Sequence, residues 1–115
     1  MLHCDCYING KYFTHIVSDG IIVATPSGSS AYNLGAGGSL VSSQVPAILF
    51  TPICPFSLSF RPILFPENVQ IELLIPKSAR TEGFVSIDAN KNFLLLKGEK
   101  LLVHSAPEKV KCILI

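Results

Sequence analysis

Turn-forming residues recur along this chain at short intervals and leave only short apolar runs between them. The clearest is Asn9-Gly10, the pair that most favours a two-residue β-hairpin turn. Short strands separated by such turns are typical of a two-layer β-sandwich. The runs predict strands at 2–8, 11–17, 21–25, 45–51, 69–75, 84–88, 93–96, 100–104 and 109–115.

Two segments depart from this strand pattern. Residues 29–36 are the one good helix candidate, because Ser29 can cap the N-terminus and Gly37-Gly38 can end the helix. Residues 52–66 carry four prolines and predict an irregular loop. Arg61 is expected to hold this loop by binding backbone carbonyls. The predicted fold is mainly β, a two-layer β-sandwich with one short helix.

Composition excludes several kinds of partner. A length of 115 residues allows one domain. Hydrophobic residues make up 49% and charged residues 15%, against about 25% charged in typical domains. Two explanations fit this low share of charged residues. One is that the strands are well filled with apolar side chains, and the other is that part of the surface is covered by another domain or by a second copy of the chain. The net charge of +1, with scattered Lys and Arg, indicates no nucleic acid, and the proline-broken apolar runs indicate no membrane.

The four cysteines are irregularly spaced, with no Cys-x-x-Cys pair. They predict free thiols in a reducing compartment rather than a metal site, so we expect a cytoplasmic protein. Cys4 and Cys6 would point to the same side of a strand. Cys54 is expected to be a small buried apolar residue.

The apolar run 21–25 leads directly into a turn rich in Pro, Gly and Ser. Such a turn before a helix presents backbone N–H groups and hydroxyls to phosphate or ribose oxygens. Gly28 allows close approach of a ligand, and Tyr32 offers a flat ring. Without its flanks, this turn would more often be a plain loop with an N-cap.

The flanking residues strengthen the ligand interpretation. Residues 19–32 resemble the D-G-x-I-x-x-T-P-T-G-S-T-A-Y segment of NAD kinases, which phosphorylate NAD to NADP. Residues 51–62 match that family's T-P-I-C-P-H-S-L-S-F-R-P segment, with Phe56 in place of histidine, and 85–88 resemble its V-S-F-D hairpin. The resemblance implies that residues 1–115 form the C-terminal domain of the NAD kinase fold, which contacts NAD and other subunits.

The resemblance also implies the site residues. Taken alone, Asp19 before Gly20 would be a turn former, and Asp88 would have the same role. In the family, the aspartate at the position of Asp19 contacts NAD. The family also has a ligand contact just beyond the aspartate at the position of Asp88, and here this contact falls on Asn90 or, less readily, on Ala89. The expected NAD contacts are Asp19, Ser30, Ala31, Tyr32, Asn33, Leu34, Gly35 and Asn90.

The chemistry itself is expected elsewhere. NAD kinases carry a G-G-D-G motif, whose aspartate deprotonates the ribose 2′-hydroxyl, and an Asn-Glu pair, and neither occurs in this chain. We therefore expect an absent N-terminal α/β catalytic domain, no catalytic residue here, and no activity of the chain alone. The whole enzyme would use NAD and ATP with Mg²⁺ as a homo-oligomer, and no cofactor would be tightly bound to this chain.

Two other classes remain as alternatives. One is a non-catalytic β-sandwich interaction module that retains the family pattern as a scaffold. The other is a lipid kinase of the diacylglycerol or sphingosine type, although those families lack the paired motifs at 25–32 and 51–55. The choice of ATP or polyphosphate as donor, and of NAD or NADH as acceptor, is left open by the sequence.

Overall fold

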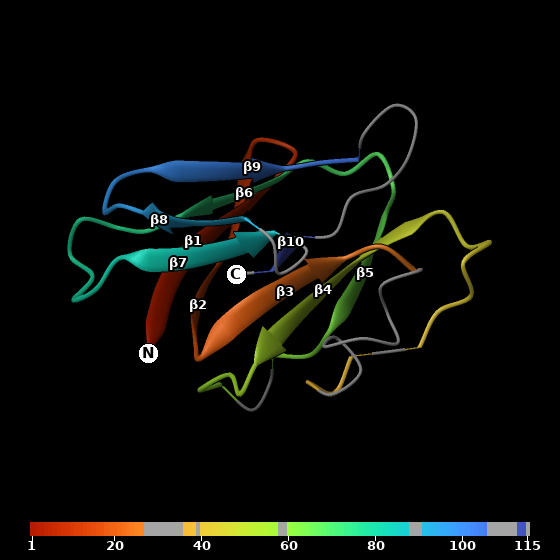
Figure 1. The fold of residues 1–115 in the computed structure, drawn as a ribbon, viewed down its shortest axis with the longest axis horizontal. Coiled ribbons are helices and arrows are strands. Elements are labelled where there is room, and N and C mark those ends of the chain that lie inside the picture. Colours follow the sequence, from red (N-terminus) through yellow and green to blue (C-terminus); the bar gives the residue numbers. More distant parts are fainter. Residues whose placement is uncertain (27–35, 39, 58–59, 88–90, 106–112, 115) are drawn as a thin grey trace.

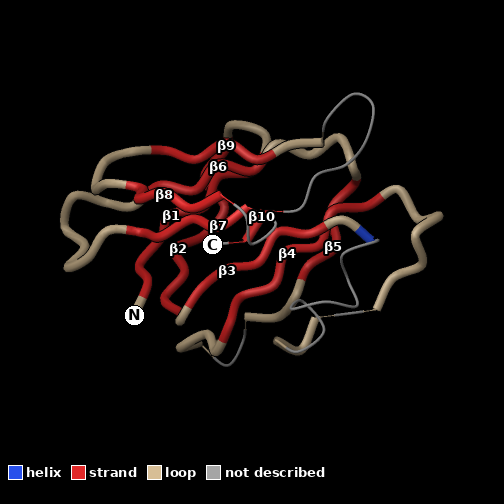
Figure 2. The backbone as a smooth tube through the Cα atoms, in the orientation of Figure 1, coloured by secondary structure: helices blue, strands red, loops and turns tan. Residues whose placement is uncertain are grey.

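The computed structural model describes residues 1–26, 36–38, 40–57, 60–87, 91–105 and 113–114 (Figure 1). Residues 113 and 114 are described by their backbone alone. Strands occupy most of the described chain, as Figure 2 shows. They are β1 (Leu2–Ile8), β2 (Lys11–Ser18), β3 (Gly20–Ala24), β4 (Ala47–Ile53), β5 (Ile63–Pro66), β6 (Ile71–Leu74), β7 (Gly83–Ile87), β8 (Lys91–Leu95), β9 (Lys100–Val103) and β10 (Ile113–Leu114).

The strands form two sheets, one with the order β2-β1-β6-β9 and one with the order β5-β4-β3-β10-β7-β8. The expected mainly β, two-layer architecture is confirmed. Each neighbouring pair is antiparallel. Because β10 pairs antiparallel with both β3 and β7, those two strands run in the same direction and begin at the same edge of the six-stranded sheet.

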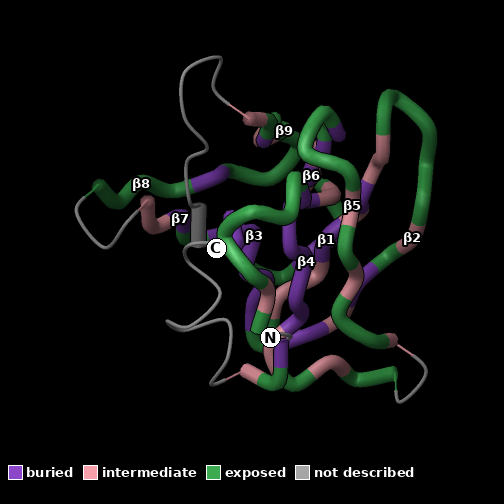
Figure 3. The backbone as a smooth tube through the Cα atoms, turned by 90° about the vertical axis from the view of Figure 1, so that its right-hand side faces the viewer, coloured by how far each residue is buried: buried purple, intermediate pink, exposed green. Residues whose placement is uncertain are grey.

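The hydrophobic core lies between the two sheets and draws on alternate residues of their strands, as the period of a half-buried strand requires. Cys4, Cys6 and Leu73 face it from the smaller sheet, and Phe50 and Val85 face it from the larger one. β3 and β4 are buried at nearly every position, whereas β8 and the first half of β2 are mostly exposed (Figure 3).

The predicted hairpin at Asn9-Gly10 is confirmed. Both residues have positive φ, 51° and 83°, as a type I′ turn requires. Asn9 also fastens the hairpin to the residue before β6, because its N–H donates to the Gln70 carbonyl at 2.8 Å and its Oδ1 accepts from the Gln70 N–H at 2.9 Å.

The proline-rich loop is shorter than predicted. Pro52 lies inside β4, and β5 occupies 63–66. The proline in each strand is tolerated for its own reason. Pro66 lies in β5, which is an edge strand. Pro52 lies beyond Phe50, where the pairing of β4 with β5 has ended and β4 pairs only with β3.

The prediction that Cys54 is buried is wrong. It is exposed and has a φ of 47°, because the chain bends sharply where β4 ends. The predicted helix at 29–36 lies outside the described residues except for Ala36, which is in a turn. Of the strand predicted at 109–115, the described part is β10. Within the described chain, no helix is long and apolar enough to cross a membrane.

Candidate functional site

Asp19 occupies the bend between β2 and β3, where its side chain is exposed. Its backbone is held on both sides. The Asp19 N–H donates to the Ile53 carbonyl at 2.9 Å, and the buried Ser18 hydroxyl donates to the Gly20 carbonyl at 2.8 Å. The carboxylate is therefore presented to solvent from a fixed main chain.

A cavity of about 230 Å³ lies beside this carboxylate and is lined by residues 1–2, 19–20 and 81–84. Since a water takes about 30 Å³ in the liquid, the cavity has room for a ring-sized group. Its ionisable side chains are the carboxylates of Asp19 and Glu82, and its large apolar ring is that of Phe84, which is 59% exposed.

Two segments that the sequence singled out meet at this edge of the larger sheet, next to the start of β7. Gly20 pairs with Ile53, so the Asp19 bend lies against the end of β4. The Phe56 N–H donates to the Val17 carbonyl at 2.7 Å, which holds the following loop against β2. Gly83 begins β7 and lines the cavity together with Asp19.

The opposite edge of the same sheet leads into the other predicted contacts. β3 ends at Ala24 and continues through the buried Thr25 to Pro26, and β7 ends at Ile87. Because β3 spans five residues, the two edges lie roughly 17 Å apart at about 3.3 Å per residue. The other expected contacts follow these exits and lie outside the described residues, so their place remains a prediction: Ser30, Ala31, Tyr32, Asn33, Leu34, Gly35 and Asn90.

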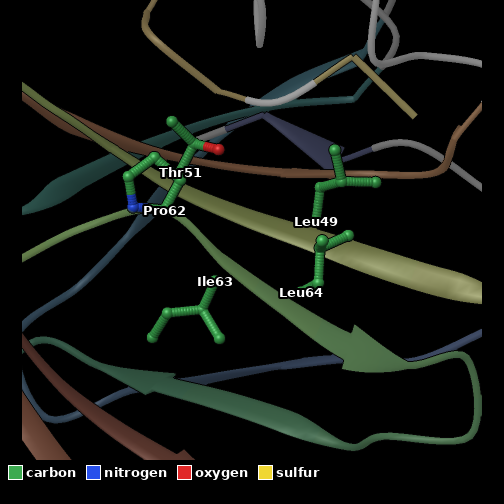
Figure 4. Close-up of a pocket in the computed structure, with 5 residues that line it drawn as sticks. All are labelled: Leu49, Thr51, Pro62, Ile63 and Leu64. Carbon is green, nitrogen blue, oxygen red and sulfur yellow. The ribbon is translucent and has the colours of Figure 1, made fainter.

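The loop between β4 and β5 is closed at its base. Thr51 and Pro62, the first and last residues of the matched segment 51–62, line one small cavity together with Leu49, Ile63 and Leu64 (Figure 4). Its volume of about 20 Å³ holds one water but no nucleotide. The Arg61 guanidinium donates to the carbonyl of the preceding residue, Phe60, at 3.4 Å, and its expected loop-holding role stays a prediction.

Thr81, Glu82 and Phe84 are residues of this site that the sequence analysis missed. They reach Asp19 because β7 runs in the same direction as β3, which only the pairing through β10 reveals. Their one available signal was their position just before the V-S-I-D segment. In the described part of the chain, no three His, Cys, Asp or Glu side chains are grouped as a metal site.

The buried thiols of Cys4 and Cys6 lie in the core, away from this site. Burial raises the pKa of each thiol from 9.0 to about 12, and the proximity of the two sulfurs adds to the effect at Cys4. Both are therefore protonated at neutral pH and unsuited to act as nucleophiles.

Comparison with known proteins identifies the family. The family model for the ATP-NAD kinase C-terminal domain matches residues 1–115. The chain is 46% identical over 100 residues to NAD kinase 2, chloroplastic, of Arabidopsis thaliana, covering 87% of this chain and 10% of that protein.

Two solved structures share the fold over 97% of this chain. Yeast NADH kinase complexed with NADH is 38% identical with a TM-score of 0.65, and the match covers 28% of its chain. An NAD kinase from Archaeoglobus fulgidus in complex with ATP is 27% identical with a TM-score of 0.81, and the match covers 42% of its chain. The chain thus spans less than half the length of each of these relatives. Because the family model matches all of its residues, the chain belongs to the ATP-NAD kinase C-terminal domain family.

Proposed function

We propose that this chain is the NAD-contacting domain of an NAD kinase, which transfers a phosphoryl group from ATP to the 2′-hydroxyl of the adenosine ribose of NAD. An N-terminal α/β domain would supply the catalytic base and most of the triphosphate site. The observation that carries the proposal is the ring-sized cavity between the Asp19 bend and the start of β7, with the end of β4 hydrogen-bonded to that bend. The NADH and ATP complexes of the two structural relatives support it.

The charges of the cavity indicate which part of a dinucleotide it would take. Asp19 and Glu82 both present carboxylates to the cavity, and carboxylates repel a pyrophosphate. A ribose, whose hydroxyls can donate to a carboxylate, or a cationic nicotinamide ring fits better. Phe84 supplies an apolar ring against which such a group can pack. The pyrophosphate would then lie outside this cavity.

The described residues offer no resident magnesium site, because no cluster of three potential ligands is found among them. We propose that Mg²⁺ reaches the whole enzyme as a complex with ATP, where it would neutralise phosphate charge. This chain's own contribution is to bind and orient the dinucleotide.

Calorimetric titration of NAD into the chain tests the proposal. Asp19→Asn removes the charge without changing the shape of the side chain. A lost charged hydrogen bond should weaken NAD binding about ten- to a hundredfold. The matched control is Asp5→Asn, because Asp5 pairs with His15 on the outer side of β1, away from the cavity.

Equal NAD affinity of the wild type and Asp19→Asn, with both folded, would place the dinucleotide elsewhere. Equal losses in Asp19→Asn and Asp5→Asn would indicate a general effect of charge and would also contradict the assigned site.

A further inference from the structure

A second cavity lies on the outer side of the β1–β2 hairpin. It has a volume of about 170 Å³ and is lined by His3, His15, Pro76, Ser78, Ala79 and Arg80. At about 30 Å³ per water, it has room for five or so water-sized groups, which is the size of a phosphate group with its four oxygens. It shares no lining residue with the cavity at Asp19.

The two imidazoles form one wall of this cavity. The rings of His3 and His15 lie 5.7 Å apart between centroids, tilted by 45°. The Nδ1–H of His15 donates to Asp5 Oδ1 at 2.7 Å, so the carboxylate sets the ring orientation and leaves Nε2 as the nitrogen available to a ligand.

The permanent charge among the described lining residues of this cavity is positive. Arg80 supplies a permanent cation and Ser78 a hydroxyl donor, and no carboxylate is among the described lining residues. Asp5 on β1 is held by His15. Glu72 on the neighbouring β6 lies opposite Tyr7 and pairs with Lys100 at 3.7 Å. Asp19, Glu82 and the Met1 end of the chain line the other cavity. The surroundings therefore favour an anion.

We propose that this cavity binds a phosphate group, with Arg80 and Ser78 donating to its oxygens and with the protonated imidazoles of His3 and His15 completing the site. Arg is suited to this because its guanidinium can donate two parallel hydrogen bonds to one phosphate. A neutral His15 would turn a lone pair rather than a hydrogen toward the anion, so binding is linked to uptake of protons by the imidazoles. The site is independent of the proposed NAD contact.

The test is a titration of inorganic phosphate into the protein, followed by NMR signals of the His3 and His15 side chains. Arg80→Gln should weaken binding about tenfold or more, the effect of losing a charged hydrogen bond. Arg61→Gln is the matched control, because Arg61 lies in the β4–β5 loop and does not line this cavity. Asp19→Asn should also leave phosphate binding unchanged. Melting temperatures establish that each variant is folded.

The histidines are tested with sulfate, whose charge does not change near neutral pH. Sulfate binding should strengthen as the pH falls, because an imidazole that gains a proton gains a donor and a positive charge. The increase should vanish in the double variant His3→Gln/His15→Gln and persist in His104→Gln, whose ring faces the Ser105 carbonyl instead.

Equal phosphate binding by the wild type and Arg80→Gln, or sulfate binding that does not depend on pH, would overturn the proposal and indicate an adventitious ion only. A comparison of inorganic phosphate with glycerol 3-phosphate identifies the source of the group. Tighter binding of the ester supports a phosphorylated metabolite, and equal binding supports free phosphate as the ligand.

Discussion

Asp19 owes its position to hydrogen bonds around its main chain, so the backbone that carries its carboxylate is fixed before any ligand arrives. The bond to the Ile53 carbonyl and the buried Ser18 hydroxyl hold the bend from either side. A site built in this way loses little conformational entropy on binding, which favours affinity. The same reasoning separates Asp19 from Asp5, whose carboxylate is already occupied by His15.

The core thiols give a prediction at the scale of single residues. The folded-state pKa of Cys4 and of Cys6 is raised to about 12 from 9.0 by burial. The stability that each protonated thiol gives the folded protein is therefore fully present below about pH 9. It is lost as the pH rises toward 12, because the unfolded chain releases the proton more readily. The loss approaches about 1.4 kcal/mol of unfolding free energy per pH unit per thiol.

Chemical denaturation at several pH values above 9 measures this slope. Cys6→Ala should flatten the decline in unfolding free energy relative to the wild type. Cys54→Ala should leave it unchanged, because Cys54 is exposed. Parallel curves for the wild type and Cys6→Ala would show that the core thiol does not contribute in this way.

Residues whose role depends on local sequence were predictable, and those placed by distant strands were not. Asn9 adopts the left-handed conformation that its turn requires, which the Asn-Gly pair predicts. Asp19 was found through the resemblance. Glu82 and Phe84 were missed, because they reach Asp19 through the parallel course of β3 and β7. Cys54 was wrongly predicted, since no local pattern reveals a bend with positive φ.

At the scale of elements, the β1–β2 hairpin is joined to β6 by more than sheet pairing. Asn9 exchanges two hydrogen bonds with Gln70, which precedes β6. Asn9→Ala keeps the backbone bond but leaves the Gln70 N–H without its acceptor. It also puts alanine at a φ of 51°, which disfavours most residues.

Asn9→Ala should lower the free energy of unfolding by about 1–3 kcal/mol, measured by urea denaturation. Asn9→Asp keeps an acceptor oxygen and should restore most of the loss. Asn92→Ala, at an exposed position on β8, should change stability by less than about 0.5 kcal/mol. A loss in Asn9→Ala no larger than that in Asn92→Ala would argue against this link between hairpin and sheet.

Strands bounded by turn residues were predicted within a few positions, because period and turn chemistry are local signals. β5 was missed, since prolines at 62 and 66 are typical of loops and their tolerance depends on β5 being an edge strand. The order of strands in the two sheets could not be predicted, because it depends on contacts between residues far apart in the sequence.

At the scale of the whole molecule, apolar side chains remain uncovered along β7 and β8, at one end of the larger sheet. Phe84 and Leu94 are directly paired and each 59% exposed, and Phe93 is 41% exposed. β8 is the edge strand of the described sheet, with backbone groups open to further pairing. Such a surface favours association.

We expect a homo-oligomer that buries at least roughly 1,000 Å² of surface, as stable interfaces do. Light scattering should show more than the monomer mass at about tens of micromolar. Leu94→Lys should shift the equilibrium toward monomer, and Leu102→Lys, half exposed on β9 of the other sheet, should not. A monomeric wild type at these concentrations would contradict the expectation.

We expect a division of labour, in which this chain binds the dinucleotide and another domain carries the catalytic base. The most direct test is the amount of NADP formed when the pure chain is incubated with NAD, ATP and Mg²⁺ and compared with a reaction lacking the chain. No NADP above that background is the predicted result, because the G-G-D-G motif does not occur in this chain and no group of three potential metal ligands is found among the described residues. NADP formation that is abolished by a substitution within this chain would contradict this division of labour.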